Sequence, residues 1–190
     1  MNKALWKPGN MLFPAPAVMV SCGDQPDNYN IITIAWAGNI CSEPAMTSIS
    51  IRPERHSYEL IKRTREFVIN LTTERLAFAT DFCGVKSGRE INKFERLKLT
   101  PLKGKFVAAP LIKENPVNIE CKVVEIKHLG SHDIFLAKVL GIHADQEYIK
   151  RDGSFDLRKA GLLSYSHGNY YALGKYLGHF GFSVKKKRRK

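Results

Sequence analysis

This sequence of 190 residues lacks several features that mark well-known classes of protein. Its four cysteines, at positions 22, 41, 83 and 121, form no C-x-x-C pair, so neither a zinc site nor a redox-active dithiol is indicated. No stretch approaches the roughly 18 uninterrupted apolar residues that suggest a membrane span. The absence of a G-x-G-x-x-G motif removes the usual dinucleotide fingerprint.

The amino end does not resemble a signal peptide, because Lys3 and Lys7 are followed by Pro14 and Pro16 instead of an apolar run. We therefore expect a cytoplasmic protein with no membrane partner. A hydrophobic content of 44% is sufficient for one sizeable core. We predict a single domain over residues 1–184, followed by a basic tail over 185–190.

Acidic residues are scarce, with 18 against 30 Lys and Arg, which gives a formal net charge of +12. Six of these twelve charges belong to the terminal run Lys185–Lys190, so +6 remains for the rest of the chain. We expect this run to be a disordered, solvated tail. A nucleic-acid-binding barrel is one function to consider, but no recognised binding motif accompanies the basic residues. A modestly basic body would equally attract anionic nucleotides.

The most informative stretch lies between residues 28 and 58. Two runs rich in Ile, Thr and Trp, Ile31–Trp36 and Met46–Ile51, are typical of strands. Turn residues around Gly38, Asn39 and Pro44 separate them. We predict that the two runs are neighbouring antiparallel strands.

The second run leads into the segment R-P-E-R-H-S and then into helical spacing, predicted as a helix over Ser57–Arg65. The first amides of a helix have no internal partner and favour anions. Arg52 and Arg55 add planar donor forks, and His56 and Ser57 add further donors. The junction therefore suits a phosphate, although an ordinary helix that Ser57 caps, with solvated arginines, would have the same sequence.

Both faces of the first run are apolar or nearly so, with Ile32, Ile34 and Trp36 on one face. This pattern fits a barrel wall against a partner or ligand, and equally a strand beneath a helix of its own chain. On the second run, Ser48 and Ser50 share one face. Small hydroxyl side chains could approach a flat ring, or they could simply face solvent.

The remaining chain predicts mainly strands. We expect strands at Val18–Cys22 and Phe67–Leu71, and a long hairpin formed by Val117–Leu129 and Ile134–His143. A helix over Thr73–Phe82 should stop at Gly84. The segment 165–182 is dense in glycine and aromatic residues, which suits either an arm on a second subunit or an internal cover for an open barrel edge.

A polar loop follows the second helix. Gly84 and Gly88 permit close backbone approach to a ligand, while Ser87, Arg89 and Lys93 supply donors. A plain surface loop is the alternative explanation of this segment.

Three motifs give the chain a resemblance to a known family: N-x-I-T-I-A-W at Asn30–Trp36, S-I-S-I-R-P-x-R-H-S-Y at Ser48–Tyr58, and C-G-x-K-S-G-R-E-x-N-K-F at Cys83–Phe94. A weaker match is P-L-I at Pro110–Ile112. Together they resemble the flavin reductase-like family, and the likeness covers residues from about Pro14 to Tyr171.

The resemblance implies a mainly β fold with peripheral α-helices, namely an FMN-binding split β-barrel with antiparallel Greek-key connections. It also implies a homodimer with flavin near the subunit interface. The expected function is an oxidoreductase that passes electrons from NAD(P)H or a reduced protein through FMN, with FAD as the alternative flavin, to flavin, ferric iron or another acceptor. A flavoredoxin-like electron carrier or storage flavoprotein without NAD(P)H turnover is the alternative.

The residues matching these motifs are the expected flavin-binding set. Lys93 is expected, by analogy with the family, to stabilise the flavin phosphate or the anionic reduced ring. No acid, base or nucleophile is legible as a catalytic residue, and no metal site is expected. The expected cofactor-binding residues are Asn30, Thr33, Ala35, Trp36, Ser48, Ser50, Ile51, Arg52, Arg55, His56, Ser57, Cys83, Gly84, Ser87, Gly88 and Lys93.

Overall fold

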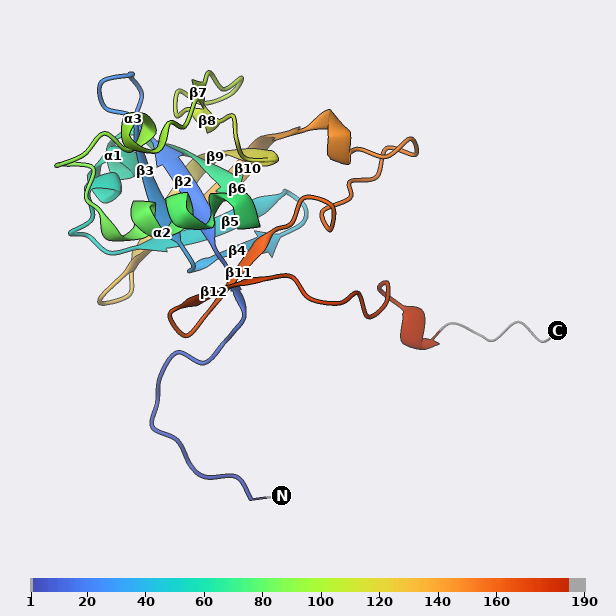
Figure 1. Cartoon of the computed structure of the whole chain (residues 1–190). Coiled ribbons are helices and arrows are strands. Elements are labelled where there is room, and N and C mark those ends of the chain that lie inside the picture. The colour runs from blue at the N-terminus through green and yellow to red at the C-terminus, as the bar shows by residue number, and fades with distance from the viewer. Residues whose placement is uncertain (1, 185–190) are drawn as a thin grey trace.

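The computed structural model describes residues 2–184, and its main element is a seven-stranded antiparallel sheet (Figure 1). The predicted basic tail lies outside the described residues. The sheet follows the order β3-β2-β6-β9-β10-β5-β4. Its strands are β2 (Val18–Cys22), β3 (Asn30–Ile34), β4 (Ala37–Cys41), β5 (Met46–Ile51), β6 (Glu66–Leu71), β9 (Val117–His128) and β10 (Asp133–Ala144).

Two small sheets and a few helices complete the fold. One sheet has the order β1-β11-β12, and the other pairs β7 with β8. The mainly β fold is therefore confirmed. The remaining elements are β1 (Ala15–Pro16), β7 (Pro101–Leu102), β8 (Leu111–Ile112), β11 (Leu163–Ser166), β12 (Asn169–Ala172), α1 (His56–Thr64), α2 (Ala77–Val85), α3 (Lys93–Leu97) and the 3₁₀ turns η1 (Glu74–Leu76), η2 (Gln146–Tyr148) and η3 (Phe182–Val184).

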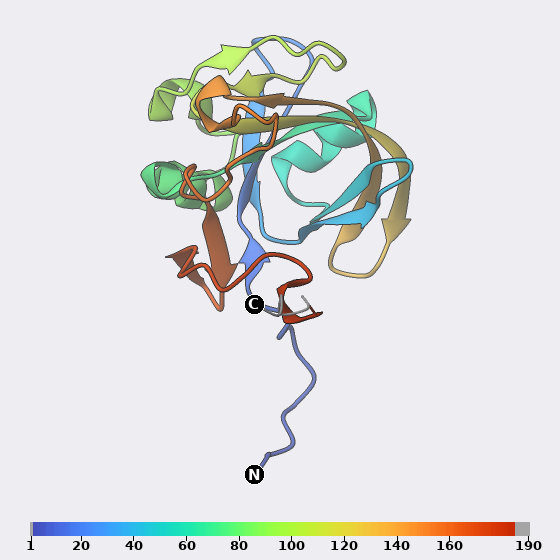
Figure 2. The same cartoon turned by 90° about the vertical axis from the view of Figure 1, so that its right-hand side faces the viewer.

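The main sheet curls around α1, which lies within the curve (Figure 2). The amide of Ser50 on β5 donates to the carbonyl oxygen of Trp36, just after β3, at 2.8 Å. This bond connects the end of the β3 edge strand to β5, which lies next to the opposite edge strand β4.

The prediction that residues 31–36 and 46–51 form neighbouring strands is wrong. β5 pairs instead with β4 and β10. The segment expected to turn is itself a strand, because Gly38 pairs with Ser48 and Asn39 with Thr47. Thr47 Oγ1 also donates to the Gly38 carbonyl at 2.8 Å. The chain reverses only at residues 42–45.

Inward-facing residues at alternate strand positions form the main core, as a period of two requires. α1 contributes Tyr58 and Ile61 to this core from the middle of the curve. Each large apolar side chain buried here stabilises the fold by about 1.5–3 kcal/mol. The buried members are Val18, Val20, Cys22, Ile32, Ile34, Ile49, Ile51, Tyr58, Ile61, Phe67, Ile69, Cys121, Val123, Phe135 and Ala137.

A second core lies on the outer face of β2 and β3, beneath α2 and α3. Met19 and Ile31 pack there with Ala79, Cys83 and Phe94. The two apolar faces of β3 are thus explained: Ile32 and Ile34 face the barrel interior, and Ile31 lies beneath helices of its own chain.

The prediction that Gly84 stops the second helix is wrong, because α2 continues to Val85. A Cβ at Gly84 would lie 3.3 Å from Thr33 Cβ, which is tighter than most such contacts. The missing side chain therefore lets this turn of α2 approach β3 closely. The predicted helix at residues 57–65 is confirmed as α1, one residue earlier, and Arg65 ends it in a left-handed conformation.

The predicted long hairpin is confirmed as β9 and β10, with register shifts near Leu136 and Val139. Glu120 on β9 is fully buried on the outer face. Its carboxylate accepts the amides of Lys105, Phe106 and Val107 at 2.7–3.1 Å, and His143 Nε2 lies 2.5 Å from it. This carboxylate therefore holds the loop before β8 against the hairpin.

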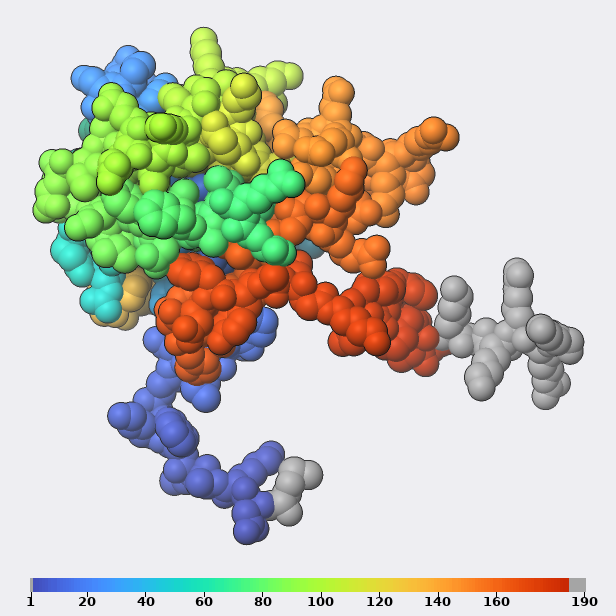
Figure 3. All heavy atoms as spheres, viewed as in Figure 1, coloured from blue at the N-terminus to red at the C-terminus, as the bar shows by residue number. Residues whose placement is uncertain are grey.

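The first and last segments of the described residues project from the body (Figures 1 and 3). Residues 2–12 and 173–181 contain no regular elements. Large apolar side chains on both segments are exposed, among them Trp6, Leu12, Leu177 and Phe180. Within residues 2–184, no helix combines the length and apolarity needed to cross a membrane.

Candidate functional site

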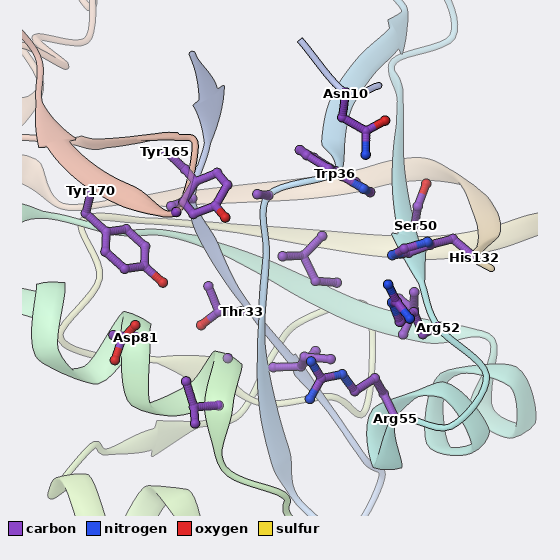
Figure 4. A pocket seen from close by; sticks show the side chains of 18 residues that line it. Asn10, Thr33, Trp36, Ser50, Arg52, Arg55, Asp81, His132, Tyr165 and Tyr170 are labelled. Atoms are coloured by element: carbon purple, nitrogen blue, oxygen red, sulfur yellow. The ribbon is translucent and has the colours of Figure 1, made fainter. Parts of the chain in front are cut away.

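Two adjoining cavities lie where β3, β5, α1 and α2 meet. The first has a volume of about 450 Å³ and the second of about 420 Å³. Ile32 and Arg55 line both, so the two cavities meet at this pair of side chains. The first opens between the end of β3, β5 and the β11–β12 hairpin (Figure 4). The second lies between the start of α1 and the loop 86–90.

The second cavity is lined by polar side chains that the fold buries almost completely. Asn30, Ser57 and Lys93 are each at most 4% exposed. Asn30 Nδ2 donates to Ser57 Oγ at 2.8 Å, which ties β3 to the first turn of α1. The Lys93 ammonium donates to the carbonyl oxygens of Ile31 at 2.6 Å and Cys83 at 2.9 Å. An ammonium group has three donors, so one remains for a ligand.

Positive charge gathers around this second cavity. Burial lowers the pKa of Lys93, since it disfavours the charged form. Burial, together with the nearby charges of Arg89 and Lys93, lowers the pKa of His56 as well. Arg89 reaches across to the carbonyl of Glu54 at 3.0 Å and so closes one side. A bound anion would relieve the repulsion among these cations.

The first cavity has a backbone wall and a cationic end. The stretch Thr33–Trp36 borders it on one side and Ser50–Arg52 on another. Figure 4 shows Arg52 and His132 beside Ser50. Burial lowers the pKa of His132, and so do the charges of Arg52 and Arg55, although Glu54 partly opposes them.

Aromatic side chains line the opposite end of the first cavity. Tyr165 and Tyr170, from the β11–β12 hairpin, lie across from Arg52 and His132 (Figure 4). Burial and the neighbouring Asp81 raise the pKa of Tyr170 to about 12. Phe13 packs between Trp36, at 6.0 Å, and Tyr165, at 6.1 Å between ring centroids. The rim is therefore flat and apolar, with one carboxylate.

The fold brings together every expected cofactor-binding residue except Ser48. Ser48 is 8% exposed and pairs with Gly38 on β4 and Leu136 on β10. Ser50 lies beyond the last β4 pair and lines the first cavity, whereas Ser48 lies between β4 and β10 and lines neither cavity. Those lining the first cavity are Thr33, Ala35, Trp36, Ser50, Ile51, Arg52, Arg55 and Gly84, and those lining the second are Asn30, Arg55, His56, Ser57, Cys83, Ser87, Gly88 and Lys93.

Ser57 does not cap α1, which was the alternative explanation of this junction. Arg55 occupies the N-cap position of α1 without a side-chain capping bond. Ser57 lies inside the first turn, where its hydroxyl accepts from Asn30. The hydroxyl is thereby fixed at the wall of the second cavity.

Several lining residues escaped the sequence analysis because they come from distant segments. His132 belongs to the turn between β9 and β10, and Asn10 to the amino-terminal segment. Asp81 occupies the face of α2 toward Tyr170. For Tyr165 and Tyr170, the only signal in the sequence is the density of aromatic residues in the segment 165–182, for which the sequence suggests an arm or an internal cover.

Comparison with known proteins places this geometry among flavoproteins. The family model described as "Flavin reductase like domain" matches residues 10–174. Flavoredoxin of Desulfovibrio vulgaris (Miyazaki F) is 28% identical, with a TM-score of 0.89 over 97% of this chain and 100% of that one.

Two further solved structures share the fold. A protein of Shewanella frigidimarina described as a flavin reductase with a split barrel domain is 23% identical, with a TM-score of 0.78 over 87% of this chain and 85% of that one. The FMN-binding protein of Thermus thermophilus is 19% identical, with a TM-score of 0.79 over 94% and 99%. These likenesses confirm the predicted split barrel.

Proposed function

This chain belongs to the flavin reductase-like family, and we propose that it is an FMN-binding oxidoreductase that passes electrons from NAD(P)H, or from a reduced protein partner, to flavin, ferric iron or another acceptor. Membership of the family supports a flavin-related oxidoreductase or electron-transfer role. The specific cofactor, donor and acceptor are our proposal. Bound FMN would supply the hydride-accepting and electron-releasing chemistry.

One observation supports the cofactor most directly: a strongly polar cavity adjoins a flatter, partly aromatic one through Ile32 and Arg55. FMN has the same two parts, a phosphate and a planar ring. The buried donors Asn30, Ser57 and Lys93 suit a phosphate, since an anion satisfies donors that water cannot reach. The residues of the second cavity therefore fit the group.

In this proposal the first cavity holds the ring. Thr33–Trp36 and Ser50–Ile51 would bring backbone and hydroxyl groups to its polar edge. The close approach of Gly84 to Thr33 keeps α2 tight against this wall. Arg52 and His132 would place positive charge or a donor near the end of the ring that becomes anionic on reduction.

The electron donor would meet the open side of this cavity. Tyr165 and Tyr170 offer flat faces there, which suit a nicotinamide ring. Hydride transfer depends on stacking distance and orientation more than on a general base. In this proposal the site needs no dedicated catalytic acid or base.

A second copy of this chain is part of the proposal. Both projecting segments expose large apolar side chains, with Leu5 and Phe180 fully exposed at 103% and 105% of the reference. Exposure of this kind costs free energy in an isolated molecule, and a partner surface would relieve it. Because the segments leave the body beside the β1-β11-β12 sheet, the dimer contact would lie near the first cavity.

The test of this function is titration of flavin-free protein with FMN, followed by anaerobic addition of NADH or NADPH. We expect saturable quenching of flavin fluorescence and then loss of the visible flavin absorbance. Protein that never binds FMN would refute the proposal. Protein that binds FMN but is bleached by neither nucleotide would favour the flavoredoxin-like alternative, a carrier reduced by another protein.

A further inference from the structure

One fully buried carboxylate connects the two sides of the site without lining either cavity. Asp133 begins β10 and is 1% exposed. Its Oδ2 accepts the hydroxyl of Tyr58 at 2.5 Å and lies 2.8 Å from Nδ1 of His128. Tyr58 belongs to the first turn of α1, whereas Asp133 belongs to the sheet.

Residues adjacent to these bonds line the cavities. Ser57 precedes Tyr58 and lines the second cavity, whereas His132 precedes Asp133 and lines the first. Asp133 also pairs with Ile51 on β5, and Arg52 follows Ile51 into the first cavity. Asp133 is therefore next to His132 in the chain and contacts the neighbours of two further cavity residues, Ser57 and Arg52.

The surroundings make this link stiff. Tyr58 is 3% exposed, and its ring packs edge-on against Phe135 at 5.4 Å between centroids. The Tyr58 hydroxyl lowers the pKa of Asp133 despite burial, and His128 and Lys62 lower it further. The same hydrogen bond raises the pKa of Tyr58 to about 12, with burial and Glu59 adding to the effect. The pair therefore stays a neutral phenol and a carboxylate near neutral pH.

We propose that Asp133 is a positioning residue that acts through Tyr58 to hold the first turn of α1, and with it Ser57, in register for the phosphate of a nucleotide. The inference rests on the proposed flavin site. It concerns the phosphate end, because Tyr58 directly follows Ser57 in the first turn of α1 and its hydroxyl bond to Asp133 ties that turn to the sheet.

Phosphate selectivity separates this role from a general effect on folding. FMN and riboflavin carry the same ring, and only FMN carries the phosphate. The ratio of their dissociation constants therefore reports the contribution of the phosphate grip. A variant that only loosens the barrel would weaken both ligands together, whereas a misplaced first turn of α1 would weaken FMN alone.

The test measures both dissociation constants by flavin fluorescence, with Tyr58→Phe as the principal variant. Removing the hydroxyl should weaken FMN about tenfold, equal to about 1.4 kcal/mol, and riboflavin less than about twofold. Asp133→Asn keeps an acceptor for Tyr58 and should weaken FMN by no more than about threefold. His128→Ala is the matched control, since it removes the other, exposed contact of the same oxygen and should leave the ratio unchanged.

The outcomes distinguish this inference from the function on which it rests. Wild-type protein that binds neither flavin would overturn both. If wild-type protein binds FMN and Tyr58→Phe retains the FMN-to-riboflavin ratio, only the role of Asp133 is overturned. The same holds if His128→Ala raises the ratio of the FMN to the riboflavin dissociation constant as much as Tyr58→Phe does. Thermal unfolding of each variant identifies any that fail to fold. If Tyr58→Phe does so, Asp133→Ala, which removes the acceptor of the same hydrogen bond, is measured in its place and should change the ratio in the same direction.

Discussion

The side-chain amide of Asn30 donates to the hydroxyl of Ser57 at 2.8 Å, and Gly88 lies directly against that amide. A Cβ at Gly88 would approach Asn30 Oδ1 to 2.2 Å. Because Asn30 is 4% exposed and held by Ser57, it has little room to move. The loop that follows α2 is thus packed onto the bond that joins β3 to α1.

This contact predicts that Gly88→Ala displaces the loop and loosens the second cavity. We expect weaker FMN binding by about tenfold and a melting temperature lower by a few degrees, as for a loss of about 1 kcal/mol. Fluorescence titration and thermal unfolding check both. Gly38→Ala is the control, since a Cβ there meets nothing within 4 Å. Equal behaviour of the two variants would contradict the packing argument.

Arg55 lines both cavities and should be the most sensitive arginine. Replacing it with Ala removes a charge-assisted contact worth about 1.5–3 kcal/mol, so FMN should bind about 10-fold to 100-fold more weakly. Calorimetric titration measures the change. Arg96→Ala on α3, outside both cavities, controls for net charge. FMN affinity that is the same in both variants would remove Arg55 from the site.

The ionisation of the buried Lys93 ammonium should make FMN affinity depend on pH. Burial lowers its pKa below the ordinary 10.5, and a bound phosphate would raise it again. Affinity should therefore be full below the lowered pKa and decrease as the pH rises through it. Burial raises the pKa of Cys83 to about 11 and that of Cys22 to about 12, so both thiols remain neutral at the pH values below about 10 at which binding is measured.

Titrations between about pH 7 and pH 10 test this prediction. In Lys93→Gln, affinity should be lower and nearly independent of pH over the same range. A wild-type affinity that stays constant up to pH 10 would show that the ammonium does not face the anion.

The buried Glu120 carboxylate should make the free energy of unfolding depend on pH in the acid range. Burial alone would raise its pKa, but bonds from His143 and from the amides of residues 105–107 lower it below the ordinary 4.5. Its stabilisation is therefore fully present above about pH 4.5 and is lost as the pH falls through the lowered pKa of the folded state. Glu120→Gln should cost about 1–3 kcal/mol at pH 7 and progressively less toward acid.

Urea unfolding at several pH values measures this difference. Glu125→Gln, a half-exposed carboxylate on the same strand, is the control and should change stability little at any pH. A deficit in Glu120→Gln that does not shrink toward acid would contradict the assignment.

If the exposed apolar side chains of the projecting carboxyl-terminal segment form the dimer contact, two charged substitutions in that segment should disrupt the dimer. Leu177→Asp together with Phe180→Asp would place charge on an apolar contact and shift the protein toward the monomer mass of 21.5 kDa. Light scattering after gel filtration gives the mass. Leu102→Asp on β7, elsewhere on the surface, should leave the mass unchanged. A wild-type monomer would exclude the proposed dimer.

Local sequence determined much of this protein, because some patterns carry their own geometry. Alternating apolar residues specified β9 and β10, and the spacing from Tyr58 to Ile61 specified α1. Arg52, Arg55, His56 and Ser57 could be grouped from sequence because they are consecutive around one strand-to-helix junction. A strand that is apolar on both faces likewise required covering on both sides.

The tertiary structure decided what long-range pairing controls. Gly38 and Asn39 suggest a turn, but pairing with Ser48 and Thr47 makes them part of β4. Ser48 thereby lies between β4 and β10, and only Ser50, beyond the last β4 pair, lines a cavity. His132, Tyr170 and Asp133 reach the site from segments far along the chain, and no local pattern encodes that approach. The sequence determines which groups are available, whereas closure of the sheet determines which of them meet.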